Sequence, residues 1–421
     1  MSSIEPTEPS RSSPVELPRL PAEAVAALAA QPVCGYRPFG PPAPEPTALA
    51  AMALLAAGQR PAADVALDWL ADRQQADGSL RAEASAEKAT WPTGWAMLAW
   101  QIGIESESPG ALSRAATGNG PVVPYRPPAD SPANHQGAAT RAASLPSADA
   151  AASRRWADAL RRAAGWALTT EGHTVEQCDT VGHNPRLRGW AWVETTHSWV
   201  EPTAIHVLAL RRCGLGDHPR CREAVAMLLD RMLSDGGWNY GYTTVLGTRV
   251  LPHVQPTGLA LAALAGIPDA ADSARRALSY LDATISPATP TASLCHAILG
   301  MTGHGRRPAE ADAWLASACR TTLSGERSPY ALALVVLAAA GDACGWFDFA
   351  AAPRFGLAAD SRARGTPRVR AAGLVGRALR RRSRQSRGAS LAAGRHRVGG
   401  RSNRRSATAA NDDRFGNAFL R

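Results

Sequence analysis

Residues 202–214 read PTAIHVLALRRCG, and five further segments of the chain repeat this pattern. Each segment begins with a proline, continues through an Ala- and Leu-rich run, and ends near a glycine; the other five begin at Pro46, Pro92, Pro256, Pro290 and Pro329. Proline suits the first turn of a helix, where its missing N–H is not needed, and glycine permits a left-handed cap after the last turn. The pattern predicts six helices that are apolar on most of their faces, as expected for the inner layer of a helical assembly.

Between these segments lie runs that also have helical periodicity but carry more charge. They cover residues 63–78, 153–170, 219–237, 270–285 and 309–325. An apolar helix paired with an amphipathic one, repeated along the chain, is typical of an α/α solenoid or of a closed α/α toroid or barrel. The sequence therefore predicts an all-α fold built from repeated helix pairs over residues 46–345.

Two of the charged runs end in a shared motif, QQADGSL at residues 74–80 and MLSDGGWNYG at residues 232–241. These motifs resemble the Gln-x-x-Asp-Gly-x-Trp repeat of squalene–hopene cyclases and of protein prenyltransferase β-subunits. Leu80 stands in place of the tryptophan in the first copy, and Met232 in place of the glutamine in the second. The resemblance spans roughly residues 46–345 and implies an α/α toroid with an aromatic central cavity that binds or transforms an isoprenoid chain.

The catalytic motifs of those two families need separate inspection, because a fold does not imply a reaction. The Asp-x-Asp-Asp acid of the cyclases does not occur in this sequence. The zinc-binding Asp-x-Cys pair of the prenyltransferases is not found either, since Cys178–Asp179 has the opposite order and spacing. Residues 189–204 do resemble a stretch of the bacterial prenyltransferase and squalene oxidase repeat proteins. Whether the chain is an enzyme stays open at this point.

That stretch, GWAWVETTHSWVEPTA, is the first candidate site. Glu194, His197 and Glu201 are candidate catalytic residues, because carboxyl and imidazole groups serve as acids and bases. The indoles of Trp190, Trp192 and Trp199 are candidate substrate-binding groups, since an aromatic face attracts a cation. In the alternative interpretation the indoles fill space between helix layers, and Glu201 carries negative charge at a helix N-terminus, where such charge is favourable.

A second aromatic segment, residues 235–257, lies one repeat later and is expected to neighbour the first. Its candidate substrate-binding residues are Trp238, Tyr240, Tyr242 and His253. The alternative is a turn that its glycines permit, with aromatic side chains as plugs.

No metal or cofactor is predicted. Glu194 and His197 form a single E-x-x-H motif with Cys178, Asp179 and His183 upstream, whereas a zinc site needs three or four converging ligands. The seven cysteines contain no CxxC pair and are expected to be reduced thiols of a cytoplasmic protein. The longest apolar run is too short to span a bilayer, which leaves peripheral membrane contact as the expected mode of any lipid association.

Three segments lack the helical pattern and are predicted to be disordered: a Pro-rich arm at residues 1–45, an insertion at 104–152 and a tail at 351–421. The tail holds 18 Arg against three Asp, whereas residues 1–350 have more acidic than basic side chains. Nucleic-acid binding is therefore expected, if at all, through the tail alone. A shifted reading frame in a GC-rich gene would give the same composition.

Three functions remain as hypotheses at this stage. The first is an isoprenoid-binding, terpenoid cyclase- or prenyltransferase-like protein, with an isoprenoid or other apolar small molecule as its partner. The second is a non-catalytic α/α scaffold for protein–protein interaction, and the third is nucleic-acid binding by the tail. The sequence gives no oligomeric state.

Overall fold

The computed structural model describes residues 21–83, 88–106, 148–177 and 181–349, all within the first of two compact units, residues 1–361. The predicted tail at 351–421, most of the insertion, and residues 1–20 of the arm lie outside these ranges. Within them the chain is helical apart from its loops and one short hairpin, which confirms the all-α prediction.

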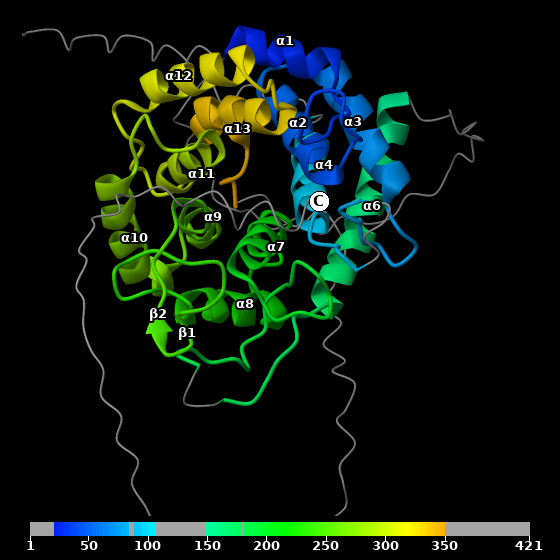
Figure 1. Ribbon diagram of the computed structural model, residues 1–421. Coiled ribbons are helices and arrows are strands. Elements are labelled where there is room, and N and C mark those ends of the chain that lie inside the picture. The colour runs from blue at the N-terminus through cyan, green and yellow to red at the C-terminus, as the bar shows by residue number, and fades with distance from the viewer. Residues whose placement is uncertain (1–20, 84–87, 107–147, 178–180, 350–421) are drawn as a thin grey trace, which may run out of the picture. The chain divides into compact units, whose positions relative to one another are not determined.

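The six proline-initiated segments form the inner helices, and all six predictions are confirmed. They are α2 (Pro44–Ala56), α4 (Thr93–Glu105), α7 (Val200–Arg212), α9 (Val254–Leu264), α11 (Thr291–Thr302) and α13 (Pro329–Ala340). Nearly every side chain of these helices is buried, as their lack of a polar face predicts. Each inner helix packs against the next one along the chain, and α13 packs against α2, so that the contacts close into a cycle (Figure 1).

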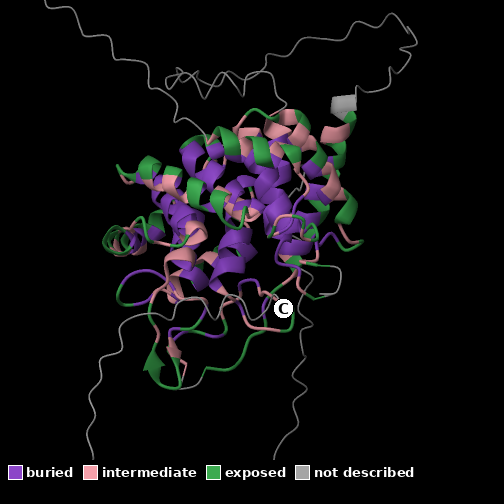
Figure 2. Cartoon of the chain, turned by 45° about the horizontal axis from the view of Figure 1, so that its top comes forward, coloured by how far each residue is buried: buried purple, intermediate pink, exposed green. Residues whose placement is uncertain are grey.

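The amphipathic segments form the outer helices, which are buried on one side only (Figure 2). They are α3 (Arg60–Arg73), α6 (Ala148–Thr169), α8 (Pro219–Asp230), α10 (Ala271–Thr284) and α12 (Ala311–Ser324). Each outer helix contacts the inner helix that precedes it. Short 3₁₀ turns, η1 (Pro268–Ala270) and η2 (Gly341–Cys344), follow α9 and α13.

A repeated hydrogen bond fixes how the loops enter α4, α7 and α9. The threonine after the inner-helix proline accepts a bond from the backbone N–H of a residue in the preceding loop. Thr93 accepts from Leu80, Thr203 from Trp190 and Thr257 from Trp238, each at 2.9 Å. The Pro-Thr pair therefore lies at the N-terminal end of the helix, and its threonine anchors the incoming loop there.

Three features differ from the sequence interpretation. Helix α1 (Ala22–Ala30) lies within the predicted disordered arm, because Ala24 and Leu28 pack into the core and α1 contacts α13. Helix α4 continues to Glu105 and α6 begins at Ala148, which shortens the predicted insertion at both ends. A hairpin of β1 (Thr244–Val245) and β2 (Thr248–Arg249) stands in the loop before α9, where no strand was predicted.

Candidate functional site

Two of the predicted substrate-binding tryptophans lie between the helix layers. Trp190 is buried, donates its indole N–H to Ala167 O at 3.1 Å, and stacks on His206 with ring centroids 4.9 Å apart. Trp238 is buried in the equivalent place one repeat later and donates to Leu228 O at 2.6 Å. Both indoles fasten an outer helix to the loop entering the next inner helix, as the packing alternative describes.

Trp192 and Glu194 lie apart from those tryptophans. Trp192 packs edge-on against Trp91, with ring centroids 4.7 Å apart. Glu194 is exposed, accepts a hydrogen bond from the Thr90 hydroxyl at 3.3 Å, and donates its backbone N–H to Lys88 O. These contacts join the loop entering α7 to the loop entering α4.

The structure does bring three of the predicted residues together at the surface. The ring of His197 lies 4.2 Å from that of Trp199 and 4.6 Å from that of Tyr242, whose hydroxyl is 3.3 Å from His197 Nδ1. Burial and the positive charge of Arg231 lower the pKa of His197 to about 4, so that its imidazole is neutral near pH 7. Tyr240 and His253 form a separate pair, with ring centroids 5.1 Å apart.

Glu201 occupies a different place, inside the cycle of inner helices. It is buried in the first turn of α7, and burial raises the pKa of its carboxyl to about 7, while a hydrogen bond from Gln255 offsets part of that shift. One of its oxygens, Oε1, has no hydrogen-bond partner among the described residues. A buried carboxyl without full pairing favours the neutral, proton-bearing form.

Glu45, in the first turn of α2, is the second buried acid and was not among the sequence candidates. Burial raises the pKa of its carboxyl to about 8, and the charge of Glu201 adds to that shift. The Tyr36 hydroxyl donates a hydrogen bond to Glu45 Oε2. Helices α2 and α7 are not neighbours in the cycle, so the two acids approach each other across its interior.

Aromatic and imidazole groups surround this pair of acids. Tyr330, in the first turn of α13, is partly buried, and desolvation followed by the charges of Glu45 and Glu201 raises the pKa of its phenol. Trp95 of α4 lies 6.3 Å from His296 of α11, measured between ring centroids, although these helices are not neighbours in the cycle. We call Tyr36, Glu45, Trp95, Glu201, His296 and Tyr330 the central cluster.

Residues 341–349, which follow α13, cover the opposite ends of the inner helices. Arg212, at the end of α7, donates to Gly345 O at 2.7 Å and to Asp348 O, and pairs with Glu105 at the end of α4. Trp346 is buried against Trp95, with ring centroids 5.3 Å apart, and its indole N–H has no partner within the described part of the chain. The central cluster is therefore bounded on one side by this segment.

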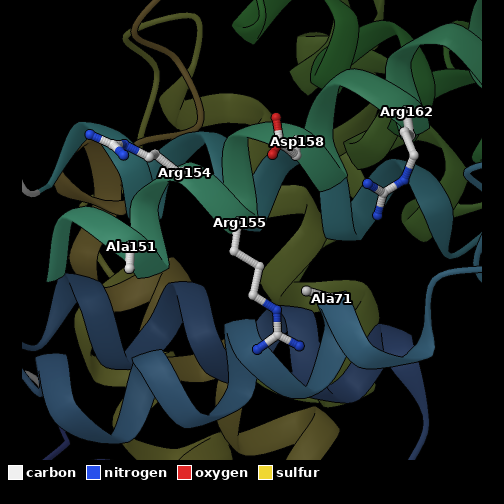
Figure 3. Close-up of a pocket in the computed structure, with 6 residues that line it drawn as sticks. All are labelled: Ala71, Ala151, Arg154, Arg155, Asp158 and Arg162. Carbon is white, nitrogen blue, oxygen red and sulfur yellow. The ribbon is translucent and has the colours of Figure 1, made fainter. Parts of the chain in front are cut away.

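Two hollows lie on the outside of the helix layers. One, of about 400 Å³, lies between α3 and α6 and is lined by Arg154, Arg155, Asp158 and Arg162 (Figure 3). Arg155 pairs there with Asp68 at 3.2 Å and with Asp72, so its charge is already balanced. The other, of about 470 Å³, lies beside α10, with the ion pair of Arg306 and Asp282 at its edge. Neither contains a predicted site residue.

Within the described ranges no group of three or more His, Cys, Asp or Glu side chains is placed to hold a metal ion. The same residues include no helix long and apolar enough to cross a membrane. Neither protein-family models nor curated proteins give a match to this sequence. The functional argument therefore rests on the geometry of the central cluster.

The sequence did contain a signal for Glu45. The tripeptide Glu-Pro-Thr occurs at residues 45–47 and again at 201–203, at the start of two inner helices. Gln255 holds the corresponding position of α9. The residue before the inner-helix proline, and not the run of tryptophans, is therefore the sequence feature that Glu45 and Glu201 share.

The buried acids and histidines predict how stability depends on pH. Burial is the largest cause that lowers the pKa of four histidines to about 3 or 4, namely His183, His197, His206 and His296. Between about pH 4 and 6.5 the unfolded chain binds protons there that the folded chain does not, so stability rises with pH.

Glu45 and Glu201 act in the opposite sense, because their folded pKa values of about 8 and about 7 exceed the unfolded value of 4.5. The folded chain holds protons that the unfolded chain has released, so stability falls with rising pH. The four histidines determine the pH dependence of stability below about pH 6.5. Above that pH, only the two acids change the free energy of unfolding. We expect maximal stability near pH 6.5 and a loss on the order of 2 kcal/mol by about pH 8. Urea unfolding of wild type and of Glu45→Gln/Glu201→Gln checks this; an equal fall in the variant would contradict it.

Proposed function

We propose that the cycle of inner helices is an α/α toroid of the terpenoid cyclase and prenyltransferase kind, and that it binds an isoprenoid chain at the central cluster. Two observations support the toroid: α13 packs against α2, and every inner helix has an outer helix beside it. The observation that carries the function is the pair of buried acids, Glu45 and Glu201, enclosed by aromatic side chains.

The chemistry of this cluster suits acid catalysis on a carbon–carbon double bond. A neutral carboxylic acid transfers its proton to one carbon of the alkene, which leaves a carboxylate on the protein and a carbocation on the ligand. The faces of Trp95, Tyr36 and Tyr330 can stabilise that cation through their ring quadrupoles. Glu45, with the higher pKa of the two, is the acid that keeps its proton at neutral pH, and the charge of Glu201 helps to raise that pKa.

The first test is extraction of the purified full chain with organic solvent, followed by mass spectrometry of the extract. We expect an isoprenoid chain in the wild-type extract, and a change in tryptophan fluorescence when farnesol is added to the delipidated protein. Trp95→Phe should reduce that change, because Trp95 belongs to the central cluster. If the wild-type extract contains no isoprenoid and farnesol causes no change in fluorescence, the proposal is wrong.

The second test separates binding from proton transfer. Glu45→Gln/Glu201→Gln keeps the shape of both side chains but removes both acidic protons, so farnesol binding should persist. Conversion of a linear polyene such as squalene should fall by at least about 100-fold. Glu326→Gln, which changes an exposed acid after α12, is the matched control and should leave conversion unaltered. Equal conversion by the double variant would exclude these acids as proton donors.

A non-catalytic scaffold is the second candidate, and one observation favours it. Side chains from helices that are not neighbours, such as Trp95 and His296, already meet inside the cycle, as a packed core would. In that case the extract contains no isoprenoid, farnesol changes no fluorescence, and neither the wild type nor Glu45→Gln/Glu201→Gln converts squalene. Nucleic-acid binding by the tail concerns residues outside the described ranges and stays a prediction.

A further inference from the structure

The large apolar side chains that the structure exposes are concentrated in the loops entering three inner helices. Phe39 stands before α2, Val175 before α7, and four residues stand before α9, namely Tyr242, Val245, Leu246 and Leu251. Leu246 is 99% exposed and Phe39 is 95% exposed. Val65, on the outer helix α3, is the one exposed large apolar residue in the described ranges that lies elsewhere. We call the loop residues the apolar rim.

Two members of the apolar rim also have unfavourable backbone conformations. Leu246 has φ 50° and Phe39 has φ 59°, in the left-handed region that glycine and asparagine adopt far more readily. Leu246 and Gly247 form the tip of the β1–β2 hairpin, a place where Asn-Gly is the common choice. A leucine there is unfavourable for two reasons, because its backbone conformation is strained and its apolar side chain is exposed to water. This combination indicates that the leucine contacts another molecule.

The loops of the apolar rim lie on the same side of the helical body. The backbone N–H of Val200, at the start of α7, donates to Tyr240 O at 2.8 Å, which joins the loops entering α7 and α9. The Ser328 hydroxyl, at the start of α13, donates to Tyr36 O at 2.6 Å, which joins the loops entering α13 and α2. Figure 2 shows the hairpin extending from the helical body, and none of its strand or tip residues is buried. The apolar rim therefore lies at the ends of the helices where α2, α7 and α9 begin.

We infer that the apolar rim docks the protein on the surface of a lipid bilayer. The exposed side chains of the rim are spread over three separate loops and do not form the single well-packed patch that a stable protein interface needs. A bilayer needs no such patch, because each inserted side chain contributes independently. The hairpin satisfies its own backbone through the pairs Thr244–Arg249 and Val245–Thr248, which lowers the cost of entering an apolar phase. Residues 236–253 contain no carboxylate, and their one cation, Arg249, pairs with Asp235 at 3.1 Å.

The inference is independent of the proposed isoprenoid chemistry, because bilayer binding requires no ligand in the central cluster. It is tested by flotation of the full chain with vesicles of pure phosphatidylcholine, which carry no net charge, in about 0.5 M salt to screen the arginine-rich tail. We expect the wild type to float with the vesicles. Phe39→Asn/Leu246→Asn should lower the partition coefficient by at least about 10-fold, since two apolar side chains no longer leave water.

Loss of folding does not explain the expected result, because asparagine tolerates the left-handed conformation better than leucine or phenylalanine. The double variant should unfold at the same temperature as the wild type or higher. A matched pair of substitutions completes the design: Val245→Thr, on the rim and 47% exposed, should weaken flotation, and Val65→Thr, on α3 and 53% exposed, should not. Flotation of Phe39→Asn/Leu246→Asn at the wild-type level would overturn the inference. So would wild-type binding that needs anionic lipid and disappears in salt.

Discussion

Replacement of Gly258 by alanine is expected to destabilise the fold by about 3 kcal/mol, although alanine is the better helix former by about 1 kcal/mol. A Cβ atom at this position of α9 would lie 2.4 Å from the carbonyl oxygen of His296 and 2.6 Å from the backbone nitrogen of Ala297, both in α11. Backbone atoms cannot change rotamer, so the two helices must separate. Gly300→Ala should act in the same way, because its Cβ would lie 2.3 Å from Gly258 O.

The control for this prediction is Gly165→Ala, which changes an exposed helical glycine of α6. A Cβ atom there meets no other atom within 4 Å, so the substitution should stabilise the protein by about 0.5–1 kcal/mol. Urea or thermal unfolding of the three variants measures the difference. If Gly258→Ala were as stable as Gly165→Ala, the close approach of α9 and α11 would be disproved.

Trp238→Ala is the second substitution with a large expected effect, about 3–5 kcal/mol of unfolding free energy. The indole is completely buried, and its N–H donates to Leu228 O at the end of α8. Truncation leaves a cavity between α8 and α9 and removes the bond that orders the loop. Trp238→Phe retains most of the volume but not the hydrogen bond and should cost about 1 kcal/mol.

This prediction also separates the two interpretations of the aromatic loops. If Trp238 is a packing residue, the folded fraction of Trp238→Phe should bind farnesol with the same affinity as the wild type. If Trp238 contacts a substrate, the variant is stable but binds more weakly. Tyr242→Ala, at a partly exposed position, should change stability by no more than about 0.5 kcal/mol and serves as the comparison in chemical unfolding.

The helix pairs were predictable because the determinants of each helix are local. Pro46, Pro202 and Pro256 mark helix starts in the sequence, and Gly214 and Gly266 adopt positive φ after helix ends. Helix α1 was missed because six of its nine residues are alanine and only Ala24 and Leu28 are buried, so its sequence shows little apolar periodicity; contacts with α2 and α13 stabilise it. The hairpin was missed because its tip is Leu-Gly, and a leucine gives no turn signal.

The central cluster was only partly predictable, for a different reason. Glu201 was identified because it follows a run of aromatic residues, but its distance from Glu45 depends on how far two non-neighbouring helices lie from each other. That distance is set by how all six inner helices pack together, and the sequence of any single helix does not determine it. His197, Trp199 and Tyr242 come from two loops that are one repeat apart. The sequence predicted that these loops are neighbours, and the three side chains do contact one another.

The packing of α13 against α2 also has a consequence for biosynthesis. The hydrogen bond from Ser328 to Tyr36 joins residues 292 positions apart, so the cycle cannot close until nearly all of the described chain has left the ribosome. Until then α2 presents an almost wholly apolar surface without its partner, as does α11 on the side that α13 covers. Exposed surfaces of this kind are recognised by chaperones and promote aggregation. Synthesis of this protein should therefore depend on chaperones most strongly in the interval just before α13 emerges.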